Sequence, residues 1–141
     1  MKFISSNFWK DTGESRVIMQ HLGKKFFGFA HLHPEDDKPS EYTGCSLAEK
    51  RATIKALKYE HKIAKEEAEA ARLFVRNCES YAKFNKDDDS AKCMYRQLNK
   101  KIKRVNDLAD DINDLYDSIY REIHMRERIL KKLNESKEDN S

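Results

Sequence analysis

Two long apolar seams with helical spacing constrain the fold of this chain more than any other feature. In the first, apolar or small residues step by three and four with one gap: Leu47, Ile54, Leu57, His61, Ala64, Ala68, Ala71, Val75, Cys78 and Ala82. In the second, the same spacing gives Met94, Leu98, Ile102, Val105, Leu108, Ile112, Leu115, Ile119, Ile123, Leu130 and Leu133. The polar stretch "FNKDDDS" separates them. This pattern predicts two helices of nearly equal length in a long antiparallel, coiled-coil-like hairpin.

Local residues set the expected ends of these helices. Ser46 and Glu49 form a capping box that predicts the start of the first arm, and Asp89 or Ser90 can cap the second. We therefore expect a helical hairpin over 46–135, with arms of about 46–86 and 89–134, and a disordered tail at 136–141. Ala dominates the first seam, and Ile and Leu dominate the second, so large side chains can pack against small ones.

The first 45 residues have a different composition. "RVIMQHL" and "KFFGFAHL" are rich in β-branched and aromatic residues and flank "GKK", which predicts a β-hairpin, and "MKFISSNF" can add a third strand. Alternation places Phe27, Phe29 and His31 on one face of the hairpin, and the other face receives Phe26, Gly28, Ala30 and Leu32. We therefore expect a mostly helical α+β protein, with a β-hairpin region and exit loop over 1–45.

Composition narrows the classes of function. Charged residues make up 38% of the chain, and 28 basic and 25 acidic residues are interspersed with a net charge of +3, which argues against a duplex nucleic-acid partner. The three cysteines include no CxxC pair, which argues against a disulfide framework and a zinc site. The absence of a long apolar run argues against a membrane partner. The interpretation is a cytoplasmic protein with reduced thiols.

The stretch "HLHPEDD" allows two interpretations. His31 and His33 share one face of a strand, so they could bind a divalent metal together with Asp36 or Asp37. The other interpretation is that Pro34 breaks the strand and the carboxylates form a solvated turn, which we favour because no further metal motif supports a site. We expect no metal and no cofactor.

Catalytic candidates are few. Cys45 precedes the expected helix cap, where a helix N-terminus would activate a thiol, but a Cys in a Thr-Gly-Cys-Ser turn is more often a packed neighbour of the cap. No nucleotide-binding loop or nucleophile motif occurs. We therefore expect that the protein is not an enzyme.

The end of the second arm, "YDSIYREIHMRERILKK", holds the candidate ligand-binding residues. It combines aromatic planes with guanidinium groups, the two devices needed to stack a nucleobase and hold its phosphates. The candidates are Tyr116, Tyr120, Arg121, His124, Arg126 and Arg128. The alternative is a solvated helix face stabilised by charge pairs such as Glu122 with Arg126 and Glu127 with Lys131.

Residues 25–58 carry a resemblance to small accessory proteins of phages of Gram-positive bacteria. A hairpin ending in Pro-Glu-Asp, a spaced Gly and a helix beginning Ala-Glu-x-Arg-Ala make up the pattern, here Glu35, Asp36, Gly44, Ala48, Glu49, Arg51 and Ala52. The two His before Pro34 and the long second arm depart from it. In size and architecture the chain resembles the anti-Thoeris sponge proteins. That resemblance implies a homodimer or higher oligomer, in the cytoplasm of an infected bacterial host, that sequesters a cyclic ADP-ribose-type signal.

Three functions compete at this stage. The first is a non-enzymatic sponge for a cyclic nucleotide signal, which requires a pocket with at least two Arg and one aromatic side chain. The second is a protein-binding inhibitor of a bacterial immune system, such as an anti-CRISPR, which requires an exposed apolar or acidic strip on the helical arms. The third is a structural coiled-coil component of a phage particle.

Overall fold

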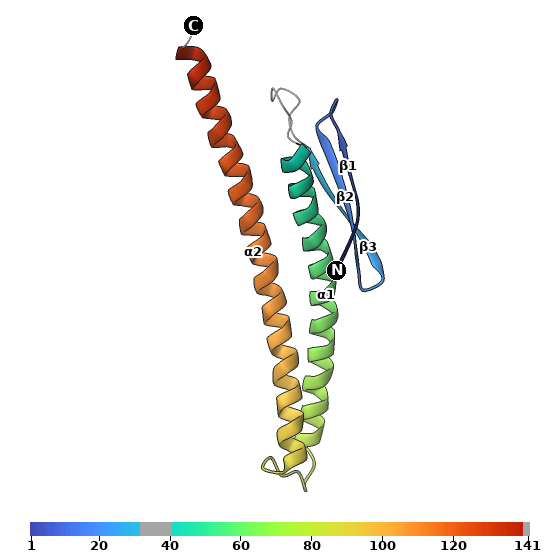
Figure 1. Ribbon diagram of the computed structural model, residues 1–141. Coiled ribbons are helices and arrows are strands. Elements are labelled where there is room, and N and C mark those ends of the chain that lie inside the picture. The colour runs from blue at the N-terminus through green and yellow to red at the C-terminus, as the bar shows by residue number, and fades with distance from the viewer. Residues whose placement is uncertain (32–40, 140–141) are drawn as a thin grey trace.

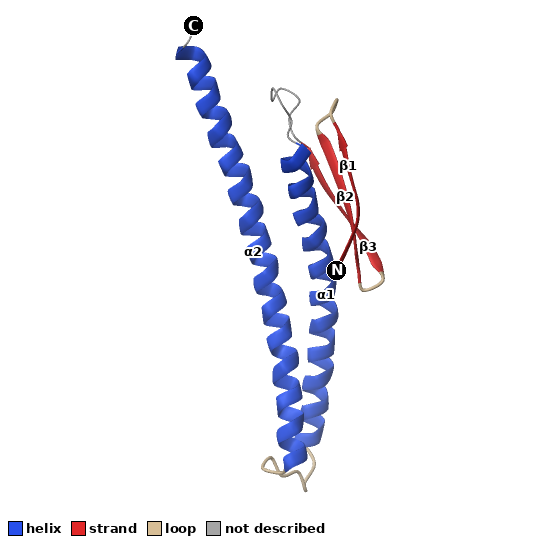
Figure 2. Ribbon diagram, in the orientation of Figure 1, coloured by secondary structure: helices blue, strands red, loops and turns tan. Residues whose placement is uncertain are grey.

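The chain folds into a small sheet followed by two long helices. The computed structural model describes residues 1–31 and 41–139, and within these the elements are β1 (Lys2–Trp9), β2 (Glu14–His21), β3 (Lys24–His31), α1 (Glu41–Glu79) and α2 (Asp89–Asp139). Figures 1 and 2 show the sheet beside one end of a helical hairpin. The predicted α+β, mostly helical fold is confirmed, and so is the third strand.

The three strands form an antiparallel sheet in the order β1-β2-β3. Leu22 and Gly23 connect β2 to β3 with φ of 51° and 76°. Positive φ at both positions is the two-residue hairpin geometry that matches the twist of the strands. The turn therefore lies one residue earlier than "GKK", and Lys24 and Lys25 belong to β3.

Helix α1 lies between the sheet and α2 (Figure 1), so the molecule has three layers. From the sheet, the side chains of Val17, Met19 and Ala30 are buried against α1, whereas Phe27 and Phe29 on the opposite face are exposed. The predicted alternation of β3 is confirmed for its described residues. Leu32 lies outside them.

Close approach between α1 and β3 explains the row of small residues at the start of the helix. Ala48, Ala52 and Ala56 are fully buried, one helical turn apart. A Cβ added to Gly28 of β3 would lie 1.8 Å from the carbonyl oxygen of Ala48 and 2.6 Å from the backbone nitrogen of Ala52. The backbones of strand and helix therefore meet where neither presents a bulky side chain.

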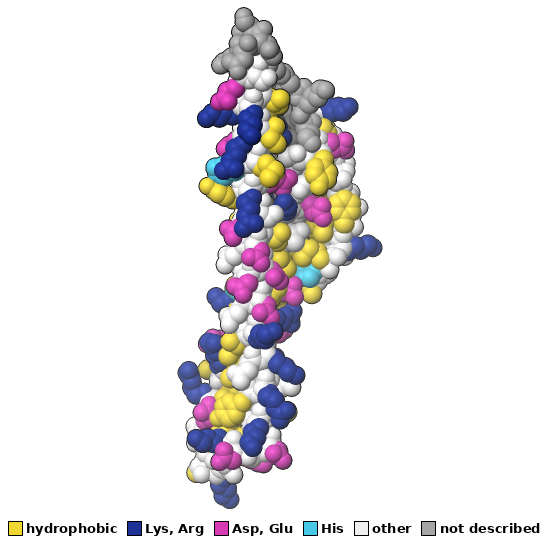
Figure 3. Space-filling view, turned by 60° about the vertical axis from the view of Figure 1, so that its left-hand side comes forward, with side chains coloured by type: hydrophobic (Ala, Val, Ile, Leu, Met, Phe, Trp, Pro, Cys, Tyr) yellow, Lys and Arg dark blue, Asp and Glu magenta, His cyan; other side chains and the backbone are white. Residues whose placement is uncertain are grey.

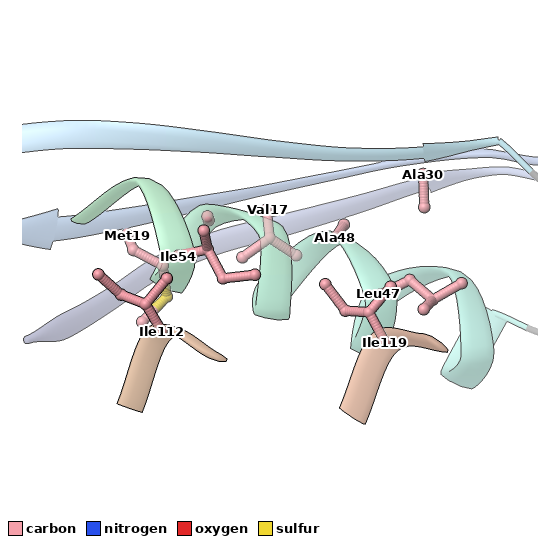
Figure 4. Packing of buried hydrophobic residues seen from close by; sticks show 9 residues of the cluster. Val17, Met19, Ala30, Leu47, Ala48, Ile54, Ile112 and Ile119 are labelled. Atoms are coloured by element: carbon pink, nitrogen blue, oxygen red, sulfur yellow. The ribbon is translucent and has the colours of Figure 1, made fainter. Parts of the chain in front are cut away.

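The two predicted seams meet between α1 and α2. Leu47 and Ile54 of α1 pack with Ile112 and Ile119 of α2 in the core cluster, which Figure 4 shows close by. Along α1 the seam residues from Leu47 to Cys78 are buried or half-buried. Large side chains from α2 therefore fill the interface, as the seams predict.

Helix α1 begins and ends earlier than predicted. It starts at Glu41, so Ser46 is not its cap, and the Ser46 hydroxyl instead contacts the Glu122 carboxylate at 3.4 Å. Gly44 disfavours a helix by about 1 kcal/mol, but it is buried in the first turns, where packing outweighs propensity. At the other end the Ser80 hydroxyl donates to the carbonyl of Asn77, a bond that competes with helix continuation. Ala82 therefore follows the helix and is exposed.

Helix α2 is longer than predicted. It continues through Asp139, so the expected disordered tail over 136–141 is wrong for residues 136–139. The reason is the composition of this end, in which Lys and Glu favour helix even without packing. The upper end of α2 extends beyond α1 in Figure 1.

One ion cluster joins the three layers. Glu60 of α1 lies 2.6 Å from the Nε2 of His21 of β2, and its other oxygen accepts a 2.9 Å bond from Arg104 of α2. Burial raises the pKa of Glu60, but the hydrogen bonds from His21 and Arg104 outweigh burial, so the net pKa lies below its ordinary value.

This lowered pKa predicts acid sensitivity. Because the folded state holds the Glu60 carboxylate in its charged form, the associated stability is present above the unfolded pKa of about 4.3 and is lost as the pH falls through the lower folded value. We expect Glu60→Gln to be less stable than the native protein at neutral pH, with a difference that narrows below about pH 4. Urea unfolding of both proteins across this pH range measures it. A constant difference would contradict the ion cluster.

Candidate functional site

Four of the six predicted ligand-binding residues lie together on the outward face of α2. Tyr120, Arg121, His124 and Arg128, with Met125, line a hollow of about 370 Å³. The ring centroids of Tyr120 and His124 are 4.2 Å apart. The helical period places both side chains away from the core residue Ile119. The hollow takes all its lining residues from a single helix.

The other two predicted residues lie elsewhere. Tyr116 contacts α1, where the Lys58 ammonium lies 5.1 Å from its ring. Arg126 is half-buried, and the helical period places it on the side of Ile119 and Ile123, away from the hollow. The predicted cluster is therefore divided between two faces of α2.

A second hollow, of about 460 Å³, is built from more elements. Its lining comes from all three strands and α1: Trp9, Glu14, Ser15, Arg16, Phe29, Ala30, His31 and Arg51. We call it the sheet hollow.

Strand register brings these residues together. Glu14 pairs with Trp9 on one side and His31 on the other, so the three form one row across the outer face. Arg16 pairs with Phe29 in the next row of the same face. Most of the lining therefore comes from the face that α1 leaves uncovered, whereas Ser15 and Ala30 belong to the buried face and Arg51 comes from α1.

Two guanidinium groups enter the sheet hollow from different elements. That of Arg16 lies 5.7 Å from the Trp9 ring, and its buried Nε has no hydrogen-bond partner among the described residues. Arg51 reaches from α1 to the edge of β3, where it donates a 2.7 Å bond to the carbonyl of Phe29. A guanidinium has five N–H donors, so this bond occupies only one at Arg51.

The remaining polar groups of the sheet hollow differ in kind. The Ser15 hydroxyl is buried and has no partner within residues 1–31 and 41–139. The ring of His31 donates from Nε2 to the Thr12 carbonyl at 2.9 Å. Glu14 supplies a carboxylate. Two guanidinium groups and two aromatic rings, with a single carboxylate among them, suit a planar molecule that carries negative charge.

Sequence reasoning missed this site because it depends on pairing between strands. Arg16 stands in "SRVIM" and Trp9 in "SNFWK", and nothing local indicates that they share a row. In the sequence, Arg51 stands out only as part of the Ala-Glu-x-Arg-Ala pattern at the start of the helix. The one sequence signal that pointed to this site was the alternation of side chains along the strands. It places Phe29 and His31 on one face of β3, opposite Arg16 and Glu14 of β2.

The metal hypothesis for "HLHPEDD" is only partly open to inspection, because His33, Asp36 and Asp37 lie outside the described residues. Within residues 1–31 and 41–139, no three His, Cys, Asp or Glu side chains are grouped so that they could hold a metal ion. Cys45 is half-buried within α1. It therefore does not precede a helix N-terminus as predicted.

Comparison with protein-family models, curated proteins and solved structures found no match. Among the described helices, none has a stretch long and apolar enough to cross a membrane.

Proposed function

We propose that this protein binds a cyclic ADP-ribose-type nucleotide in the sheet hollow and sequesters it without catalysis. The observation that carries the proposal is that Arg16 and Arg51 line the same hollow as the rings of Trp9 and Phe29. Nucleotides of this class combine planar bases with phosphates, and the sheet hollow offers partners for both.

The polar groups of the sheet hollow favour an anion. Because the Nε of Arg16 is buried, a phosphate oxygen in the sheet hollow would accept from the terminal N–H groups of this guanidinium. Charge-assisted bonds of this kind are roughly twice as strong as neutral ones. Arg51 would contribute from the edge of β3 with its remaining donors.

Size is consistent with such a ligand. The volume of about 460 Å³ falls in the range of small-molecule sites, roughly 300–1,000 Å³. A base can stack on Trp9 or Phe29, which are 45% and 55% exposed. Arg16 lies 5.7 Å from the centroid of the Trp9 ring and Lys55 lies 5.7 Å from that of the Phe29 ring, so a stacked base would share each ring with one cation.

The biological setting of the proposal comes from the resemblance to phage accessory proteins. In an infected bacterial host, a protein that removes a cyclic nucleotide by binding must have a high affinity for the nucleotide and must itself be abundant. It does not need to catalyse a reaction. The proposed role is therefore anti-defence. A homodimer or higher oligomer would multiply the number of sites in each particle.

Thermal melting against a panel of cyclic nucleotides and cyclic ADP-ribose isomers tests this proposal. A ligand at about 100 times its Kd stabilises the native state by about 2.7 kcal/mol, so we expect the Tm to rise by several degrees with at least one compound. The paired substitution Arg16→Gln and Arg51→Gln should remove the shift.

A matched control comes from α2. Arg121→Gln with Arg128→Gln also removes two exposed guanidinium groups, and these line the hollow on α2. We expect the control to keep the shift. Loss of the shift in the control alone would assign binding to α2, and no shift with any compound would contradict the proposal.

A protein-binding inhibitor is the second candidate, and one observation favours it. Ile129 and Leu133 are 53% and 54% exposed near the end of α2, and Leu133 belongs to its apolar seam. Figure 3 shows hydrophobic side chains in a line between charged ones on the upper part of the molecule. A melting curve unaffected by nucleotides would favour this function.

A further inference from the structure

The outer face of the sheet extends beyond the sheet hollow. The row next to Arg16 and Phe29 contains Ile18 and Phe27, and the last row contains Lys2, Gln20 and Lys25. Phe27 is 40% exposed and does not line the sheet hollow. With Trp9 and Phe29 it makes three accessible rings on one face, which we call the aromatic face.

The charges around the aromatic face are unbalanced. Lys2, Arg16 and Lys25 occupy outward positions of the strands, and Arg51 and Lys55 reach the edge of β3 from α1. Within residues 1–31, the outward positions of the strands carry a single carboxylate, that of Glu14. The whole chain, by contrast, has 28 basic and 25 acidic residues, so its charges nearly balance. This face is therefore distinctly cationic on a nearly balanced protein.

Two cations from α1 follow the edge of β3, beside its exposed rings. Arg51 donates to the carbonyl of Phe29, and one helical turn further on Lys55 donates to that of Phe27, each over 2.7 Å. Four residues of helix rise by about 6 Å, and two residues of strand advance by about 6.7 Å. The two spacings match, so the two cations lie along the edge of β3 at the spacing of its two exposed rings, and the Lys55 ammonium is 5.7 Å from the centroid of the Phe29 ring.

We propose that the aromatic face binds a single-stranded nucleic acid, with successive bases stacked on Phe27 and Phe29 and phosphates held by Lys55 and Arg51. Each nucleotide of a single strand supplies one planar base and one phosphate, which is the repeat that β3 and α1 present. Stacking on aromatic side chains together with a cationic track is how proteins bind single strands with little sequence preference.

The edge of β3 favours this occupant over another protein strand. The carbonyl oxygens of Phe27 and Phe29 already accept bonds from Lys55 and Arg51, so they are not open to an added strand. A single nucleic-acid strand needs no backbone pairing. It needs the exposed rings and the remaining N–H donors of the two cations.

This inference goes beyond the proposed function, and the two can be separated. Both use Phe29 and Arg51, but Phe27 and Lys55 lie outside the sheet hollow. Substitution of Phe27 therefore reports on strand binding alone. Binding of a free nucleotide should depend on Arg16 and Trp9.

Fluorescence polarisation of a labelled single-stranded oligouridine of about twelve nucleotides tests the inference. We expect saturable binding that weakens with salt, by about fifty-fold between about 50 and about 200 mM if four phosphates are contacted. Phe27→Ala should weaken binding at least about five-fold, because one stacked base is lost. Lys55→Gln should reduce the salt dependence.

Tyr120→Ala is the matched control, since it removes an aromatic ring that is 65% exposed on α2. It should bind the oligonucleotide like the native protein, and the Tm of each variant shows that it is folded. Failure to bind at about 50 mM salt, or equal binding by Phe27→Ala, would overturn the inference. Self-association that Phe27→Ala abolishes, without oligonucleotide binding, would assign the face to a second copy and also overturn it. In that case a nucleotide-induced rise in Tm would leave the proposed function standing.

Discussion

Replacing Gly28 with alanine is expected to destabilise this protein by about 3 kcal/mol or more, at the upper end of what overpacking costs. The added Cβ would lie 1.8 Å from the Ala48 carbonyl oxygen and 2.8 Å from its carbon. These are backbone atoms of α1, so no side chain can rotate away. The helix must separate from β3, which loosens the buried contacts of Ala48 and Ala52 as well.

Gly23→Ala is the matched control for this prediction. Gly23 has a φ of 76°, but a Cβ there would meet no atom within 4 Å. Its substitution therefore carries only the conformational cost of a left-handed residue, about 1–2 kcal/mol. Urea unfolding of both variants measures the difference. If Gly28→Ala cost no more than Gly23→Ala, the close contact between strand and helix would be wrong.

Leu47→Ala is expected to cost about 2–5 kcal/mol, the range for a large apolar side chain removed from a core. Leu47 is 4% exposed and belongs to the cluster that joins the sheet, α1 and α2. Figure 4 shows it with Ile119 of α2 between the helices. Because the free energy of unfolding of native proteins is about 5–15 kcal/mol, this single substitution removes a large share of the stability.

The same substitution on the same helix gives the control. Leu73 of α1 is 51% exposed, so Leu73→Ala removes little buried surface and should cost less than about 1 kcal/mol. Chemical unfolding of the two variants side by side measures both values. Equal losses would mean that Leu73 is covered in solution, by a second copy or another partner, and would contradict its exposure in the single chain.

Helical spacing was sufficient to predict α1, α2 and their pairing. The seam from Leu47 to Cys78 identified the residues that face α2 because burial against a second helix imposes a regular period. The same period could not reveal the second buried face of α1. Ala48, Ala52 and Ala56 are poor indicators of burial from sequence, since alanine is also the best former of exposed helix.

Helix ends were harder to predict than helices. Ser46 and Glu49 satisfy a capping box, but the helix continues through them because packing against the sheet and α2 stabilises the turns from Glu41 onward. At the end of α2, charged residues that indicated a tail instead form helix to Asp139. Local rules decide such ends only where tertiary contacts are weak.

The sheet hollow could not be predicted because its residues are distant in sequence. Trp9, Arg16 and Phe29 become neighbours only through strand register, which is set by the two turns and by which face of the sheet is buried. Arg51 joins them only because α1 packs closely against Gly28. The cluster on α2 was easier to recognise because residues one turn apart are neighbours on any helix.

The most direct test of the account uses the single tryptophan of the protein. Trp9 lines the sheet hollow, so its fluorescence reports directly on a ligand bound there. Titration with cyclic ADP-ribose and its isomers should give a saturable change in emission with at least one compound. The change should disappear in Arg16→Gln with Arg51→Gln and persist in Arg121→Gln with Arg128→Gln. Emission that stays constant with every compound would contradict nucleotide binding at the sheet hollow.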